Sequence, residues 1–192
     1  MNGQMTELEA VNEVLAAVGD QPVQTLAAGT YIEAVRIQQI LRNTSRKIQS
    51  KGWWFNEIEN KTLQPDSGGF IYLGNNVIEV SVLDDHDGSI IQRGNRMYDR
   101  KNDTYTFTKP IKVDLRLNLE WNELPQIARS YFTILTTIAY NSGFVGRTDI
   151  VQELKEELFE RQKSMYISET YNRDINLLKN TRSFNIAFKN RR

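Results

Sequence analysis

Apolar residues near the start of the chain recur with the period of an α-helix. Spacings of three and four residues place one stripe on a single helical face: Leu8, Val11, Leu15 and Val18. Thr6 and Glu9 have the spacing of a capping box, in which each side chain bonds a backbone N–H of the first turn. Gly19 and Pro22 follow with the usual signals of a helix end. The pattern predicts a helix over residues 6–18.

A second helix is predicted by the same kinds of signal. Thr30 and Glu33 form another capping box, and Gly52 ends the segment. Between these signals, one face carries Ile37, Leu41, Thr44 and Ile48. We therefore expect a helix over about residues 30–50.

Residues 53–120 change to the period of a β-strand. The clearest alternation puts one apolar set on a single face: Ile111, Val113, Leu115, Leu117 and Leu119. A second strand near residues 77–83 would direct Ile78, Val80 and Val82 to one face, and Val77, Glu79, Ser81 and Leu83 to the other. Turns rich in Gly, Asn and Asp separate the runs. This region predicts an antiparallel sheet or a small sandwich.

Helical spacing returns after Pro125. It is carried by Ile127, Tyr131, Ile134, Leu135 and Ile138. Gly143 and Gly146 close that segment, and Asp149 caps a charged helix expected to run to about residue 171. Its inner face would consist of Val151, Leu154, Leu158 and Met165. The last twenty residues have weak periodicity and are expected to be irregular.

The order of these elements predicts an α+β protein. Residues 1–52 and 124–172 would form a four-helix bundle from two N-terminal and two C-terminal helices. No single helix has enough apolar surface to be stable alone, which favours one common bundle. Residues 53–123 would form an inserted β domain, an antiparallel sheet or small sandwich. Residues 173–192 would form an extended basic C-terminal arm.

Composition narrows the chemistry that the chain can perform. The 192 residues include no cysteine, which excludes disulfides, thiol catalysis and cysteine-ligated metals. The single histidine, His86, excludes a multi-histidine metal site, so we expect no metal and no cofactor. No apolar run approaches 18 residues, so we expect no membrane partner. The first ten residues lack the features of a secretory signal, which predicts a cytoplasmic place of synthesis.

The formal net charge is zero, but the end of the chain is basic. Residues 173–192 carry six basic side chains and one acidic side chain. Such an arm can meet an acidic partner or phosphates, and its apolar residues at period two can add a strand to a partner. The alternative is a solubilising terminus. The candidate partner-binding residues are Arg182, Phe184, Ile186, Phe188, Lys189, Arg191 and Arg192.

The acidic segment at residues 84–88 resembles part of a calcium loop. With Gly88 at the sixth position of that loop, Asp85 and Asp87 would fall at the third and fifth ligand positions. Leu83 and Gly94 would then occupy the first and twelfth positions, and neither has a side-chain oxygen. We therefore interpret the segment as a polar turn between two strands.

Acidic residues near tryptophans indicate an alternative, carbohydrate-active function. A glycoside hydrolase needs two carboxylates roughly 5–10 Å apart and aromatic rings that stack on the sugar. The candidates are Glu57, Glu59, Glu120 and Glu123, with Trp53, Trp54 and Trp121. Core packing explains the tryptophans equally well. No nucleophile-elbow, P-loop or dinucleotide motif occurs, so we assign no catalytic residue.

Three consecutive aromatic residues follow Gly52. If they begin a strand, Trp53 and Phe55 point to one face and Trp54 to the other. One face would seal a helix–sheet junction. The other would pack in the same core or on a neighbouring subunit, since aromatic residues are favoured in interfaces.

Several segments, taken in order, resemble the tail tubular protein A family of short-tailed, podovirus-type bacteriophages. They are Ala10–Gly19, Pro22–Leu26, Ile40–Asp66, Met97–Arg100 and Glu123–Pro125, followed by the predicted helix after Pro125. The strongest part is Ile48–Trp53 together with Phe55 and Asn56. The similarity covers most of residues 6–140.

This resemblance implies a structural role in the virion tail. Proteins of the family are head-to-tail adaptors, in which a ring of twelve copies joins the portal protein to the tail nozzle, tail tubular protein B. The ring offers docking surface for tail fibres and lets genomic DNA pass through its bore. A closed ring needs two different patches on each subunit, and the predicted bundle helices and the aromatic junction are the candidate places. Some members have been proposed to degrade polysaccharide, but no residue constellation in this sequence carries that activity.

Overall fold

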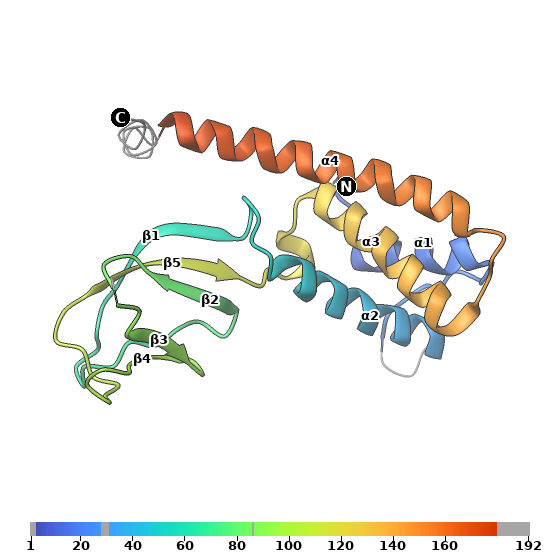
Figure 1. Cartoon of the computed structure of the whole chain (residues 1–192). Helices are drawn as coiled ribbons and strands as arrows, with labels where there is room; N and C mark the ends of the chain where they lie inside the picture. Colours follow the sequence, from blue (N-terminus) through green and yellow to red (C-terminus); the bar gives the residue numbers. More distant parts are fainter. Residues whose placement is uncertain (1–2, 28–30, 86, 180–192) are drawn as a thin grey trace. The chain divides into compact units, whose positions relative to one another are not determined.

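The computed structural model describes residues 3–27, 31–85 and 87–179 (Figure 1). Its helices and small antiparallel sheets confirm the predicted α+β class. The chain divides into two compact units. The helical unit contains residues 1–45 and 121–192, and the β unit contains residues 46–120.

Four α-helices occur in the described residues, at nearly the predicted places. They are α1 (Glu7–Val18), α2 (Ile32–Gln49), α3 (Gln126–Tyr140) and α4 (Val151–Lys179). A 3₁₀ turn, η1 (Trp121–Glu123), precedes α3, and a π-helical turn, η2 (Asn141–Val145), continues from its end.

The capping box predicted for the first helix is present in α1. The Glu9 backbone N–H donates to the Thr6 hydroxyl at 3.2 Å, and the Thr6 backbone N–H donates to the Glu9 carboxylate at 2.7 Å. The hydrogen bonds from Thr6 lower the pKa of Glu9 below its usual value. Gly19 ends the helix with a left-handed φ of 87°. Local sequence is therefore sufficient to define both ends of α1.

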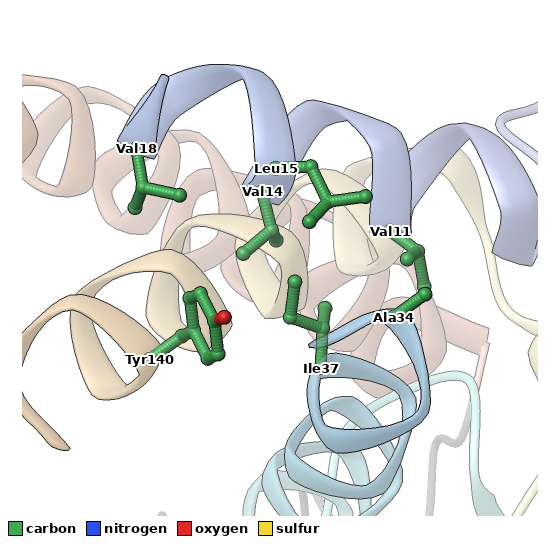
Figure 2. Close-up of a cluster of buried hydrophobic side chains, with 7 residues drawn as sticks. All are labelled: Val11, Val14, Leu15, Val18, Ala34, Ile37 and Tyr140. Atoms are coloured by element: carbon green, nitrogen blue, oxygen red, sulfur yellow. The ribbon is translucent and has the colours of Figure 1, made fainter. Parts of the chain in front are cut away.

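The core of the helical unit lies where α1, α2 and α3 meet. Figure 2 shows the side chains that converge there: Val11, Val14, Leu15 and Val18 from α1, Ala34 and Ile37 from α2, and Tyr140 from α3. All seven are at least nine-tenths buried. Burying a side chain of Val or Leu size contributes about 1.5–3 kcal/mol, so this cluster is a main source of the unit's stability.

The β unit contains two antiparallel sheets that share one core. A three-stranded sheet has the order β1 (Glu57–Leu63), β5 (Ile111–Leu117), β2 (Val77–Val82), and β3 (Ile90–Arg93) pairs with β4 (Arg96–Asp99). The buried centre is Ile71, Leu73 and Met97, and half-buried residues of β1, β2, β3 and β5, together with Phe107, pack on it. The alternation predicted for β5 is confirmed, because Val113 and Leu115 are buried while Lys112 is exposed.

The predicted faces of the second strand are wrong at one end. Val77 packs on the same core as Val80 and Val82, whereas strict alternation placed it on the opposite face. The reason is an irregular register between Val77 and Glu79 in the pairing with β5. A bulge adds one residue to a strand and so reverses the direction of every side chain before it.

The last helix is longer than the sequence predicted. α4 runs to Lys179, so residues 173–179, expected to be irregular, are helical. No Gly or Pro occurs between Val151 and Lys179, and therefore no residue type stops the helix near 171.

Candidate functional site

The aromatic segment after Gly52 forms a turn and does not begin a strand, which corrects the sequence prediction. β1 starts only at Glu57, because the Asn56 backbone N–H donates to the Trp53 carbonyl at 3.0 Å and closes a turn. Trp53 is 4% exposed, and its indole N–H donates to the Ile48 carbonyl at 2.8 Å. The rings of Trp54 and Phe55 contact edge to face, with centroids 5.0 Å apart.

Two buried amides fasten this turn to the end of β5. Asn56 accepts a bond from the Trp53 N–H at 2.8 Å and donates to the carbonyls of Gln49 and Leu117 at 2.9 and 2.7 Å. Gln49 pairs with the backbone of Leu119 in both directions, at 3.0 and 2.8 Å. Both amide side chains are almost fully buried. Such satisfied polar groups give the junction one specific geometry.

Arg116 joins the strands next to this junction. Its guanidinium forms ion pairs with Glu57 on β1, at 3.1 Å, and with Glu79 on β2. It also donates to the Ser50 carbonyl at 3.0 Å, just beyond the end of α2. Gly52 has a left-handed φ of 78°, and a Cβ there would lie 2.6 Å from Arg116 Nε. The left-handed φ favours glycine at this position, and an added Cβ would also require the Glu57 and Arg116 side chains to move.

In the helical unit, a buried arginine holds the N-terminal segment. Arg129 is 3% exposed, and burial lowers the pKa of its guanidinium. It donates four bonds of 2.8 Å, to the carbonyls of Met5, Asn122 and Leu124 and to the Gln4 side chain. The Trp121 indole N–H reaches the same Met5 carbonyl at 3.0 Å. These bonds tie residues 4–5 to η1 and α3.

The helical unit also exposes large apolar side chains on two areas. The first, called here the α4 surface, consists of Phe159, Tyr166, Ile167 and Tyr171. The second, called the α2–η2 surface, consists of Tyr31, Ile32, Val35, Phe144 and Val145. Exposed apolar patches can mark protein–protein interaction sites.

The described residues of the acidic segment, 84–85 and 87–88, lie in the polar turn that the sequence predicted. The Asp85 carboxylate accepts bonds from the Ser89 hydroxyl at 3.1 Å and from the Ile90 N–H at 2.6 Å. The Lys101 ammonium contacts Asp87 at 2.9 Å and lowers the pKa of that carboxyl. Over residues 3–27, 31–85 and 87–179, no group of His, Asp and Glu side chains is suited to hold a metal ion. His86 lies outside the described residues.

Three residues of the carbohydrate-active interpretation are engaged in other contacts. Glu57 is paired with Arg116, Trp53 is buried, and the Trp121 indole N–H bonds to the backbone of Met5. Glu57, Glu59 and Glu120 belong to the β unit, whereas Glu123 belongs to the helical unit. Nothing among the described residues supports this alternative.

The predicted partner-binding residues belong to the last segment of the chain. Arg182, Phe184, Ile186, Phe188, Lys189, Arg191 and Arg192 all lie outside the described residues. Their proposed role stays a prediction. As for membranes, none of the helices within the described ranges has the length and apolar character needed to cross one.

Four polar residues that hold the local structure were missed at the sequence level: Gln49, Asn56, Arg116 and Arg129. Gln49 and Asn56 belong to the segment that most resembles the tail tubular protein A family, which was the only available signal for them. Arg116 alternates with leucines on β5 and therefore had the pattern of an ordinary solvated residue. Each of the four also bonds to a residue more than 50 positions away, which a local pattern does not reveal.

The described residues form a structural junction and two exposed apolar surfaces. A comparison with known protein families points to the same kind of protein, one with a structural role. A family model described as tail tubular protein matches residues 8–175, which include most of the helical unit and the whole β unit. The chain therefore belongs to the tail tubular protein family and is a structural protein of a bacteriophage tail.

A curated relative agrees with this family at the level of a single protein. Tail tubular protein A of Klebsiella phage KP34 is 28% identical to this chain over 166 residues. The alignment covers 86% of this chain and 87% of that protein. The tail tubular protein A family, which was predicted from the order of the matching sequence segments, is thus confirmed.

Proposed function

We propose that this chain is a ring-forming head-to-tail adaptor, which joins the portal protein to the tail nozzle of a short-tailed bacteriophage. The observation that carries the proposal is the family match over residues 8–175. The two exposed apolar surfaces of the helical unit support it, because a ring subunit must contact a neighbour on each side.

The finer parts of the proposal concern the architecture and the partners. The four helices make one bundle, the two sheets close a small sandwich, and twelve copies form the ring. Genomic DNA passes through the bore, and tail fibres attach to the outside. The arm at residues 173–192 contacts the portal protein or the nozzle, tail tubular protein B. The chain is made in the cytoplasm of the bacterial host and ends in the virion tail.

Mass measurement and electron microscopy of the full chain test this function. The chain is studied alone, then mixed with the portal protein of the same phage, with the portal alone as the control. We expect ring-shaped particles of twelve times the 22.3 kDa chain mass, which bind one end of the portal. A chain that stays monomeric and never joins the portal would contradict the proposal.

A further inference from the structure

α4 carries apolar side chains on two different faces. Leu154 and Met165 are buried on the face toward the rest of the helical unit. On the α4 surface, Phe159 is 62% exposed, Ile167 59% and Tyr171 66%. A helix with only one packing partner keeps its other face polar. The exposed side chains of α4 therefore indicate a second partner along this helix.

The α2–η2 surface is one continuous area. Ile32 and Val35 are one helical turn apart at the start of α2 and are about half exposed. The Arg36 guanidinium lies 5.4 Å from the centre of the Phe144 ring, so it links this turn of α2 to η2. Phe144 also stacks on Tyr140, with centroids 5.5 Å apart.

The two surfaces belong to opposite sides of the same unit. α3 packs on both α1 and α4, and α2 contributes Ala34 and Ile37 to the core with α1 and α3. Figure 1 accordingly draws α4 on one side of α1 and α3, and the first part of α2 on the other. Unlike patches on opposite sides allow a head-to-tail contact that repeats from copy to copy.

The exposed charges at the start of α4 and those on α2 are of opposite sign. Over residues 151–160 of α4, the exposed acids Glu153, Glu156 and Glu160 outnumber the one exposed base, Lys155, whereas the exposed bases Lys163 and Arg173 lie farther along the helix. On the exposed face of α2 in the helical unit, the charged residues are Arg36 and Arg42, and Arg42 is 61% exposed although it contacts Glu7. Glu33 is half-buried, with its Oε2 shielded from solvent. Opposite charge favours this pairing over α4 with α4.

We infer that the α4 surface of one copy packs on the α2–η2 surface of the next copy. The inference rests on the proposed ring and names the two subunit faces that build it. Aromatic and aliphatic side chains supply the apolar centre of the contact, while Arg36, Arg42 and the α4 acids lie at its rim.

Two full-length variants test the inference. Ile167→Glu places a charge in the α4 surface, and Val35→Glu places one in the α2–η2 surface. Both side chains are exposed in the single chain, so folding is expected to be retained. Tyr72→Glu is the matched control, because Tyr72 is 54% exposed but lies in the β unit. Burying an unpaired charge should weaken association at least about tenfold. The masses of the particles are measured by analytical ultracentrifugation.

The mixture of the two variants gives the decisive result. Each variant alone should be monomeric. An equal mixture should form a dimer and nothing larger, because the intact α4 surface of Val35→Glu can bind the intact α2–η2 surface of Ile167→Glu, and the remaining two surfaces are both altered. The control should assemble like the natural chain. If Val35→Glu assembles normally while Ile167→Glu does not, α4 pairs with itself, or with a different surface, and the inference is wrong. If the natural chain forms rings and neither variant alters them, another segment, such as residues 180–192, covers α4, and the inference fails while the proposed function stands.

Discussion

The Asn56 amide satisfies backbone groups from three separate segments of the β unit. Replacing Asn56 with Ala would leave the Trp53 N–H and the Gln49 and Leu117 carbonyls buried without that partner. We expect the free energy of unfolding to fall by about 2–4 kcal/mol. Urea denaturation followed by tryptophan fluorescence measures it. The exposed Asn75→Ala variant should change the value by less than about 0.5 kcal/mol, and an equal effect of both changes would contradict this role.

Gly52 combines a left-handed backbone with a close approach of side chains. An added Cβ would meet the Glu57 carboxylate and the Arg116 guanidinium, which must move apart. Gly94 is the matched control, since its φ of 65° is similar but nothing lies within 4 Å of its Cβ position. We expect Gly94→Ala to lower the free energy of unfolding by about 1 kcal/mol, because of backbone strain alone, and Gly52→Ala to lower it clearly more. The thermal midpoint of unfolding is measured for both variants. An equal decrease in the two would show that the Arg116 side chain is easily displaced.

At the scale of elements, the capping box makes the stability of α1 depend on pH. The pKa of Glu9 is lowered in the folded chain, so its charge stabilises the fold above the unfolded pKa of about 4.5, and this contribution is lost as the pH falls through the lower folded pKa. We expect Glu9→Gln to lower the thermal midpoint at pH 7 and to approach the natural chain as the pH falls below 4.5. Thr6→Ala should cost about 1 kcal/mol at pH 7. A Glu9→Gln difference that grows on acidification would contradict the assignment.

At the scale of the whole molecule, the charge on the end of the chain predicts salt-dependent binding to DNA. Residues 180–192 carry Arg182, Lys189, Arg191 and Arg192 and no acid. Deleting them should weaken retention of duplex DNA. The plot of log affinity against log salt should also become less steep, by about 0.9 for each phosphate that the arm neutralises in the natural chain. Filter binding over a range of salt measures this. A control variant with Phe184→Ser, Ile186→Ser and Phe188→Ser keeps the charge of the arm and should still retain DNA. An unchanged salt dependence after the deletion would show that the arm does not bind DNA.

Prediction succeeded where a pattern is local. The stripe ending at Val18 and the alternation of Val113 and Leu115 both follow from the directions that helical and extended backbones impose on side chains. The turn at Asp85 was also predicted, because its groups lie within five residues of one another. Prediction failed at Trp53, where a turn that Asn56 bonds to the end of β5 replaces the expected strand. It also failed at Val77, where a bulge in the pairing with β5 changes the direction of the side chain.

The sequence by itself determined the element types, most of their limits, the absence of thiol chemistry and the family of the chain. These properties depend on composition and on short spacings, which any conformation of the chain preserves. Only the tertiary structure decided that Gln49 bonds to Leu119, 70 residues away, and that Arg129 holds Met5 across 124 residues. It also decided which apolar residues of α4 are buried and which are exposed. Such choices depend on the packing of distant segments, because burial is a property of neighbours and not of a side chain alone.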